Sequence, residues 1–136
     1  GETRNFPGWN CTADADGCHS VIDLLTLMVD ASWTAQAHIP LTAPTQAVAS
    51  LPGGRRTGWQ SPSRLRLRYP AGKVDGGFWR WTDGLTAPTL TVGRVKVEAL
   101  RDAFRAVANG QGDFCIHADG QPLHGIDPER MSIWFW

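Results

Sequence analysis

The sequence predicts an α+β fold, with a mainly antiparallel sheet of about five strands and two helices packed on one face of it. Three observations predict this class. Two segments carry apolar residues at helical spacing, several short segments have the alternation of strands, and Gly- and Pro-rich segments separate them. With 136 residues, of which 42% are hydrophobic and 19% charged, residues 1–136 are predicted to form a single globular domain.

The N-terminal part is predicted to contain an irregular arm and one helix. Residues 1–18 are polar and contain Gly and Pro, so we expect an irregular N-terminal arm there. The run from Ser20 to Asp23 resembles a capping box and predicts a helix from about Ser20 to Ala31. This helix has little polar surface, so it should be largely buried. Short extended segments are expected near residues 38–42 and 47–51.

The clearest strand is Arg64–Tyr69, in which apolar and basic residues alternate. Leu65, Leu67 and Tyr69 should face the helices, and the arginines should face the other way. The Gly- and Pro-rich segment 70–77 predicts a turn, so residues 78–82 are expected to return as the antiparallel hairpin partner. Another strand is expected at residues 89–92.

The C-terminal part is predicted to contain a helix and two more strands. The helix runs from about Val95 to Asn109 and ends at Gly110, a residue that commonly terminates helices. Strands are expected at residues 113–117 and 131–136. The last segment is apolar on both faces, so we expect it inside the sheet, with at least one of Trp134 and Trp136 in the core or a subunit contact.

Seven tryptophans suggest a surface as well as a core. Trp79 and Trp81 share one face of a predicted strand, and such a face is a core, a subunit contact or a ligand platform. The chain is neutral overall, but residues 31–74 contain six basic residues and no acidic ones. The predicted ligand or partner surface therefore consists of Trp59, Trp79, Trp81, Arg64, Arg66 and Arg68. A solvated outer face is the simpler interpretation of the arginines, and the neutral net charge makes a nucleic-acid partner unexpected.

The cysteines and histidines include Cys115, His117 and His124 as candidate metal ligands. No pair of ligands has the two-residue spacing of a zinc knuckle, so we expect neither a metal nor any other cofactor. Cys115 and His117 stand two apart on a strand, about 6.5 Å between Cα atoms, which is a poor spacing for a nucleophile and its base. Cys11 and Cys18 could form a disulfide in an exported protein and would be thiols in a cytosolic one.

The sequence carries no phosphate-binding loop, nucleophile elbow, zinc-protease motif or kinase signature, so no enzymatic activity is indicated. The leading hypothesis is a small bacterial domain without catalytic activity that binds a protein partner or forms a homodimer. The alternatives are a domain that binds a carbohydrate or small ligand on a Trp-lined surface, and a Cys/His metalloprotein or hydrolase. No apolar run is long enough to span a bilayer, so we expect a soluble protein without a membrane partner, either cytoplasmic or exported.

Overall fold

The computed structural model describes residues 8–43, 45, 61–72, 75–119 and 127–135. These residues form an α+β fold with two α-helices and two mixed sheets, of three and four strands. The predicted α+β class is therefore confirmed, whereas the single, mainly antiparallel sheet of about five strands is wrong. No helix in this part of the chain has the length and apolar character needed to cross a membrane.

The four-stranded sheet has the order β2 (Ala35–Pro40), β3 (Arg64–Tyr69), β5 (Thr89–Val92) and β4 (Trp79–Thr82). Strand β3 pairs antiparallel with β2 and parallel with β5, and β4 pairs antiparallel with β5. The predicted hairpin between residues 64–69 and 78–82 is wrong, because β5 lies between those two strands. The hairpin is instead formed by β4 and β5, which pair antiparallel. In the turn that follows β4, Asp83 and Gly84 both have positive φ angles, 65° and 70°.

The three-stranded sheet places β7 (Ser132–Phe135) between β1 (Gly8–Cys11) and β6 (Phe114–Ile116). The prediction that the C-terminal segment lies inside a sheet is confirmed. Strand β1 runs parallel to β7, with Trp9 opposite Ile133. The prediction of an irregular arm over residues 1–18 is therefore wrong for residues 8–11, because parallel pairing with a strand far along the chain orders them. Residues 1–7 and the expected strand at 47–51 lie outside the described residues.

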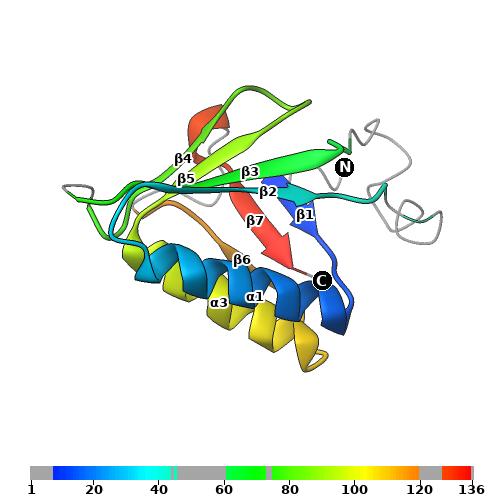
Figure 1. Ribbon diagram of the computed structural model, residues 1–136. Coiled ribbons are helices and arrows are strands. Elements are labelled where there is room, and N and C mark those ends of the chain that lie inside the picture. The colour runs from blue at the N-terminus through cyan, green and yellow to red at the C-terminus, as the bar shows by residue number, and fades with distance from the viewer. Residues whose placement is uncertain (1–7, 44, 46–60, 73–74, 120–126, 136) are drawn as a thin grey trace.

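The helices are α1 (Ala15–Asp30) and α3 (Arg94–Ala108), and a short 3₁₀ helix, η2 (Pro128–Arg130), precedes β7. Helix α1 begins earlier than predicted, because the Asp14 carboxylate accepts a hydrogen bond from the Gly17 N–H at 2.7 Å and caps the helix. The Ser20 hydroxyl donates instead to the Asp16 carbonyl inside the helix. Helix α3 agrees with its prediction to within one residue. Both helices lie side by side beneath the strands (Figure 1).

A single core joins both sheets and both helices. Leu67 is buried, with Leu65 and Tyr69 half-buried against the core, so the predicted inward face of β3 is confirmed. In β7, the buried side chains are Ile133 and Phe135, while Trp134 is half-buried. The core therefore receives Ile133 and Phe135, while Trp134 lies on the other face of β7, and Trp136 lies outside the described residues.

Candidate functional site

Two of the predicted surface tryptophans lie in the core. Trp79 and Trp81 are each 5% exposed, and their rings meet edge to face with centroids 6.2 Å apart. Both indole N–H groups donate to the carbonyl of Met131, at 3.0 and 2.8 Å. This shared acceptor ties β4 to the segment that enters β7, so neither ring offers an open platform to solvent. Trp59, the third predicted tryptophan, lies outside the described residues.

The predicted arginines form a basic outer face on the four-stranded sheet. Arg64, Arg66 and Arg68 alternate with the inward side chains of β3, and Arg80 joins them from β4. Arg66 pairs with Asp83 at 3.9 Å and Arg80 with Glu129 at 2.8 Å. Arg64 and Arg68 have no ion pair within the described part of the chain. The structure thus groups the three predicted arginines but separates them from Trp79 and Trp81, which lie on the opposite, buried face.

Cys115 and His117 come closer than their spacing suggested, with Cys115 Sγ 4.0 Å from His117 Nδ1. Burial raises the pKa of the Cys115 thiol, which favours the unreactive protonated form. Among the described residues, no three His, Cys, Asp or Glu side chains gather closely enough to hold a metal ion. His124 lies outside those residues. All three cysteines, Cys11 and Cys18 included, are free thiols in the structure.

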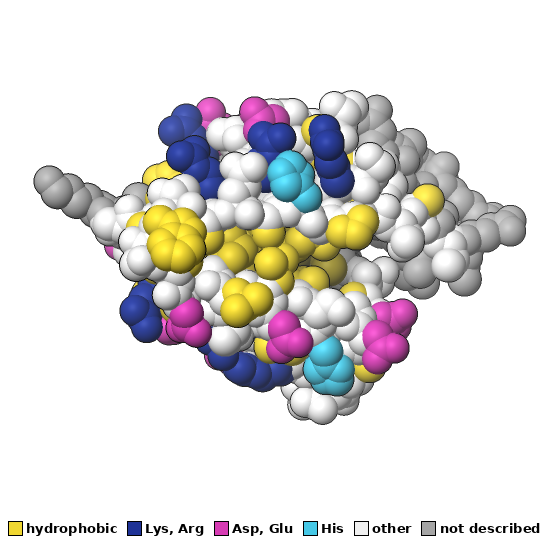
Figure 2. Space-filling view, in the orientation of Figure 1, with side chains coloured by type: hydrophobic (Ala, Val, Ile, Leu, Met, Phe, Trp, Pro, Cys, Tyr) yellow, Lys and Arg dark blue, Asp and Glu magenta, His cyan; other side chains and the backbone are white. Residues whose placement is uncertain are grey.

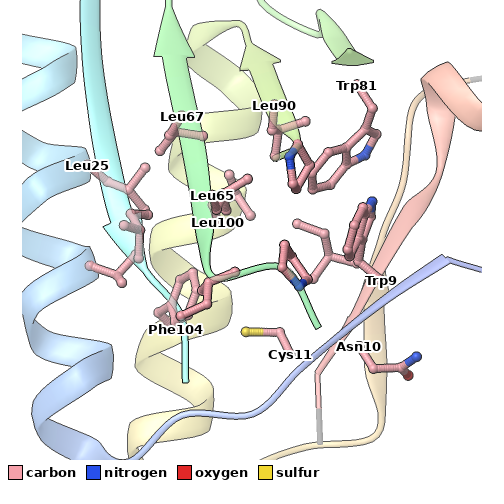
Figure 3. Close-up of a pocket in the computed structure, with 16 residues that line it drawn as sticks. Trp9, Asn10, Cys11, Leu25, Leu65, Leu67, Trp81, Leu90, Leu100 and Phe104 are labelled. Atoms are coloured by element: carbon pink, nitrogen blue, oxygen red, sulfur yellow. The ribbon is translucent and has the colours of Figure 1, made fainter. Parts of the chain in front are cut away.

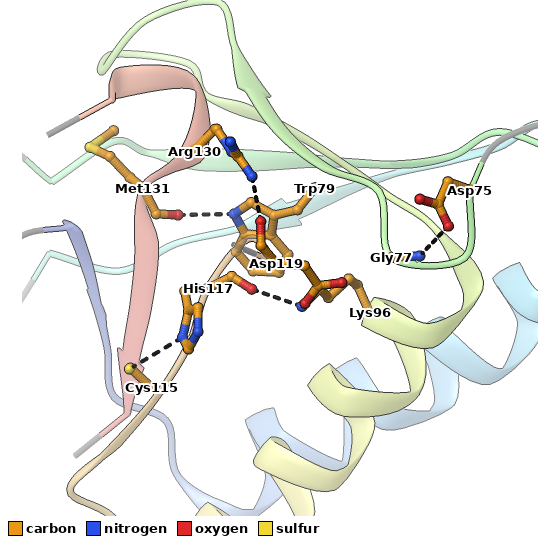
Figure 4. A network of polar contacts seen from close by, with 9 residues as sticks. All are labelled: Asp75, Gly77, Trp79, Lys96, Cys115, His117, Asp119, Arg130 and Met131. Carbon is orange, nitrogen blue, oxygen red and sulfur yellow. Dashed lines mark hydrogen bonds and ion pairs between the residues drawn. The ribbon is translucent and has the colours of Figure 1, made fainter. Parts of the chain in front are cut away.

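A polar network beside this pair fixes the end of β6 to α3 (Figure 4). Lys96, whose side chain is 10% exposed, donates from Nζ to the His117 carbonyl at 2.8 Å and to the Asp119 carboxylate at 2.6 Å. The hydrogen bond from Lys96, together with its positive charge, lowers the pKa of Asp119. Arg130 donates to the Asp119 carbonyl. Because Lys96 makes two hydrogen bonds to protein groups from a nearly buried position, this network is explained by a structural role.

An apolar hollow lies between α1 and β2 on one face of the molecule (Figure 2). Strand β2 turns Ala35, Ala37 and Ile39 inward, where all three are half-buried against the core. Leu27 on α1 and Trp33 in the turn after it are each 70% exposed. Figure 2 shows apolar side chains around this hollow, and an exposed apolar surface of this kind is typical of interaction sites.

Strand β2 also forms an edge of its sheet, with no strand beyond it among the described residues. The Leu41 N–H donates to the Ser63 carbonyl, so the odd-numbered residues of β2 make the ladder to β3. The backbone groups of Gln36, His38 and Pro40 therefore point to the open side. Pro40 lacks an N–H, so its ring interrupts the row of donors on the edge and costs no bond to β3.

A cavity of about 100 Å³ lies deeper, between the helices and the two sheets (Figure 3). Its wall is almost entirely apolar and includes Leu25 from α1, Leu65 from β3, Leu100 from α3 and Trp81 from β4. Trp9 of β1 stacks on Trp81, with ring centroids 5.1 Å apart and planes 29° from parallel. Burial, and to a smaller extent neighbouring Cys18, raises the pKa of the Cys11 thiol in this wall to about 12.

Sequence reasoning missed three residues that the structure singles out: Leu27, Trp33 and Trp9. Leu27 belongs to a helix that is apolar on nearly every side, so the sequence did not indicate which side chains would reach the surface. Trp33 stands among polar and small residues after α1, a signal that could have suggested exposure. Trp9 gave no signal, because its place depends on pairing with β7.

Comparison with known proteins does not assign a function to this arrangement. No protein-family model, curated protein or solved structure matches the chain. The function is therefore argued from the residues of this chain alone.

Proposed function

We propose that this domain is a non-catalytic binding module that adds an extended segment of a partner protein to the edge of β2. The observation that carries the proposal is the open edge of β2 beside the apolar hollow. In strand addition, backbone hydrogen bonds supply affinity, and pockets for alternate side chains supply specificity. The edge and the hollow together offer both kinds of contact.

The backbone of β2 limits the length of the added strand. On its open side, Gln36 and His38 each present an N–H and a carbonyl, and Pro40 presents a carbonyl only. The added strand can thus form its full pattern of hydrogen bonds only along residues 36–38. A short segment, held also through its side chains, fits this edge better than a long strand.

The two faces of the added strand would meet different surroundings. Side chains directed inward would enter the hollow beside Ala35 and Ala37, which favours apolar residues. Side chains directed outward would lie beside Gln36 and Pro40, opposite which stand Arg68 and Arg64 of β3. The added strand would lie about 10 Å from β3, two strand spacings away, within the reach of an arginine side chain. The preferred segment therefore alternates apolar and acidic residues.

A different protein is a better partner than a second copy of this chain. Pairing two β2 strands would place two arginine-rich faces side by side, and like charges oppose such an assembly. The preference for an acidic segment follows from the same charges. We therefore expect the free domain to be monomeric, which sedimentation would measure. If sedimentation instead shows a dimer, and His38→Pro dissociates it, the partner is a second copy of this chain.

Peptide binding tests the proposal. The probes are a fluorescent peptide that alternates Val and Glu, the same composition with the alternation scrambled, and a version with Lys in place of Glu. We expect the alternating acidic peptide to bind at least tenfold more tightly than either control in fluorescence anisotropy. Affinity should fall as salt is raised, because the outward contacts are exposed ion pairs.

Two variants at one position separate backbone pairing from side-chain contact. His38→Pro removes an N–H on the open side and leaves the ladder to β3 unchanged, whereas His38→Gln retains that N–H. We expect His38→Pro to lose binding and His38→Gln to retain it. The strand-addition proposal fails if the two variants bind equally, or if the scrambled peptide binds as well as the alternating one.

A further inference from the structure

The interior cavity extends toward the hollow at the edge of β2. Its wall includes Ile39 of β2 and Leu41, which follows that strand. From the opposite side, helix α1 contributes Val21 and Leu25. Val21 and Ile39 are half-buried and Leu41 is 36% exposed, so this part of the wall reaches the surface between α1 and β2. The apolar hollow in Figure 2 lies between the same two elements.

A strand added to β2 would bring side chains to this opening. Directly opposite residues of paired strands point to the same face of a sheet. Side chains of the added strand that stand beside Ala37 and Ile39 would therefore point inward, as those two residues do. Ile39 lines the cavity, whereas Ala37 does not. The position beside Ile39 is thus the one from which a side chain would enter the cavity.

The size of the cavity limits what can enter it. Sites for small-molecule ligands usually enclose about 300–1,000 Å³, which is several times the volume of about 100 Å³ found here. A dry apolar cavity of about 150 Å³ accommodates benzene, which has six carbon atoms. By proportion, this cavity holds about four carbon atoms, as many as the side chain of Leu or Ile contains. The rings of Phe and Trp are larger than this space.

The wall of the cavity favours a hydrocarbon side chain. Among the described residues of the wall, none is Asp, Glu, Lys, Arg or His, so a charged group inside would lose its hydration without a counter-charge. Leu65, Leu90 and Leu100 instead surround the space with carbon atoms. Affinity should therefore rise with each carbon atom that is buried, until the cavity is full.

We propose that this cavity is the anchor pocket for the partner segment and receives one aliphatic side chain, Leu or Ile, from the position beside Ile39. The pocket rests on the proposed strand addition and adds to it a requirement on the partner's sequence. One inward residue of the segment must be aliphatic and of this size. The inward residue beside Ala37, which is not part of the cavity wall, carries no such size requirement.

Peptides that differ in one side chain test the size requirement on the unmodified protein. The series alternates Thr and Glu, and a single central inward residue is Ala, Leu, Phe or Trp. The polar Thr residues leave only one side chain suited to the cavity, so a shift in register offers no second anchor. The peptides compete with the fluorescent Val–Glu peptide. We expect Leu to bind at least about tenfold more tightly than Ala, because its additional carbon atoms are buried, and Trp to bind no better than Ala.

Two matched variants show whether the cavity sets this preference. Phe104 and Phe114 both pack on Phe135, with ring centroids 5.3 and 5.2 Å from its ring, but only Phe104 of the two lines the cavity. Phe104→Leu enlarges the cavity and should improve the Phe peptide relative to the Leu peptide by about fivefold or more. The control, Phe114→Leu, should leave that ratio unchanged. Cys11→Met, which fills part of the space, should remove most of the advantage of Leu over Ala.

The outcomes distinguish the anchor pocket from strand addition itself. His38→Pro should weaken every peptide of the series alike, because it acts on backbone pairing. If His38→Pro abolishes binding but the Ala, Leu and Trp peptides bind equally, strand addition stands and the anchor pocket is wrong. The pocket is also overturned if Phe104→Leu and Phe114→Leu change the ratio equally, or if Cys11→Met leaves the preference for Leu unchanged. If no peptide binds, both proposals fail.

Discussion

At the scale of single residues, burial controls the chemistry of the thiols. It is the largest cause of the raised pKa values of Cys11, Cys18 and Cys115. A raised pKa reduces the thiolate fraction near neutral pH, and the thiolate is the reactive form. The contact between Cys115 and His117 therefore lacks the electrostatic setting that activates a nucleophile, which weakens the hydrolase alternative.

Alkylation kinetics would test this reasoning. At pH 8 we expect iodoacetamide to modify all three thiols more slowly in the native protein than in urea, because burial both raises the pKa and blocks access. Mass spectrometry of peptides would resolve the three sites. Rapid native modification of Cys115 alone would instead indicate an activated thiolate and revive the hydrolase alternative.

The ion pair between Asp119 and Lys96 predicts a pH dependence of stability. The folded protein lowers the pKa of Asp119 below the ordinary value of 3.8, mainly through the hydrogen bond from Lys96. The stabilisation is therefore present above pH 3.8 and lost as pH falls through the lower folded pKa. Asp119→Asn should be less stable than the parent at pH 7, and the difference should shrink on acidification. Urea unfolding from pH 7 to pH 3 measures this, and a constant difference would contradict it.

At the scale of elements, β4 is anchored through its two tryptophans. Truncating either Trp79 or Trp81 to Ala would empty a large part of the core and leave Met131 without one of its donors. We expect each change to lower the free energy of unfolding by about 3–5 kcal/mol. The control is Trp33→Ala, because that ring is 70% exposed, and its effect should stay within about 0.5 kcal/mol. Thermal melts that match the parent for all three variants would place the β4 tryptophans outside the core.

The strands show which features a sequence pattern can predict. Alternation in Arg64–Tyr69 predicted both the strand and its inward face, because only one orientation of the strand buries the apolar side chains and leaves the arginines in solvent. In β7 both faces are apolar, so the pattern predicted a strand buried on both sides and did not indicate that Ile133 and Phe135 would be buried more deeply than Trp134. Pairing was harder still. The short connection from β3 to β4 suggested a hairpin. In the structure β5 lies between these two strands, and the local sequence pattern does not specify which strands pair with each other.

The candidate sites could be predicted only in part. The arginines of β3 were predicted as a face, because their spacing alone places them together. The open edge of β2 depends on the strand order, and the cavity depends on how β1, β3 and both helices converge. Trp9, whose ring stacks on Trp81 in the cavity wall, is placed by parallel pairing with a strand more than a hundred residues away in the chain. No local motif carries such information.

At the scale of the whole molecule, the two sheets depend on each other. Ile133 and Phe135 of the three-stranded sheet belong to the same buried cluster as Leu67, Leu90 and Val92 of the four-stranded sheet. Helices α1 and α3 contribute Leu25 and Leu100 to that cluster. A shared core of this kind favours unfolding in one step, because neither sheet can bury its apolar face alone.

The prediction of a single domain can therefore be tested by cooperativity. Urea unfolding followed by tryptophan fluorescence and by far-ultraviolet circular dichroism should give coincident transitions. Ile133→Ala, in the three-stranded sheet, should lower both midpoints together by removing about 2–5 kcal/mol of stability. Hydrogen exchange should then show faster exchange at Leu90 and Val92 as well, although these residues belong to the other sheet. If Ile133→Ala accelerates exchange only in β1, β6 and β7, the two sheets unfold independently and the single-domain prediction is wrong.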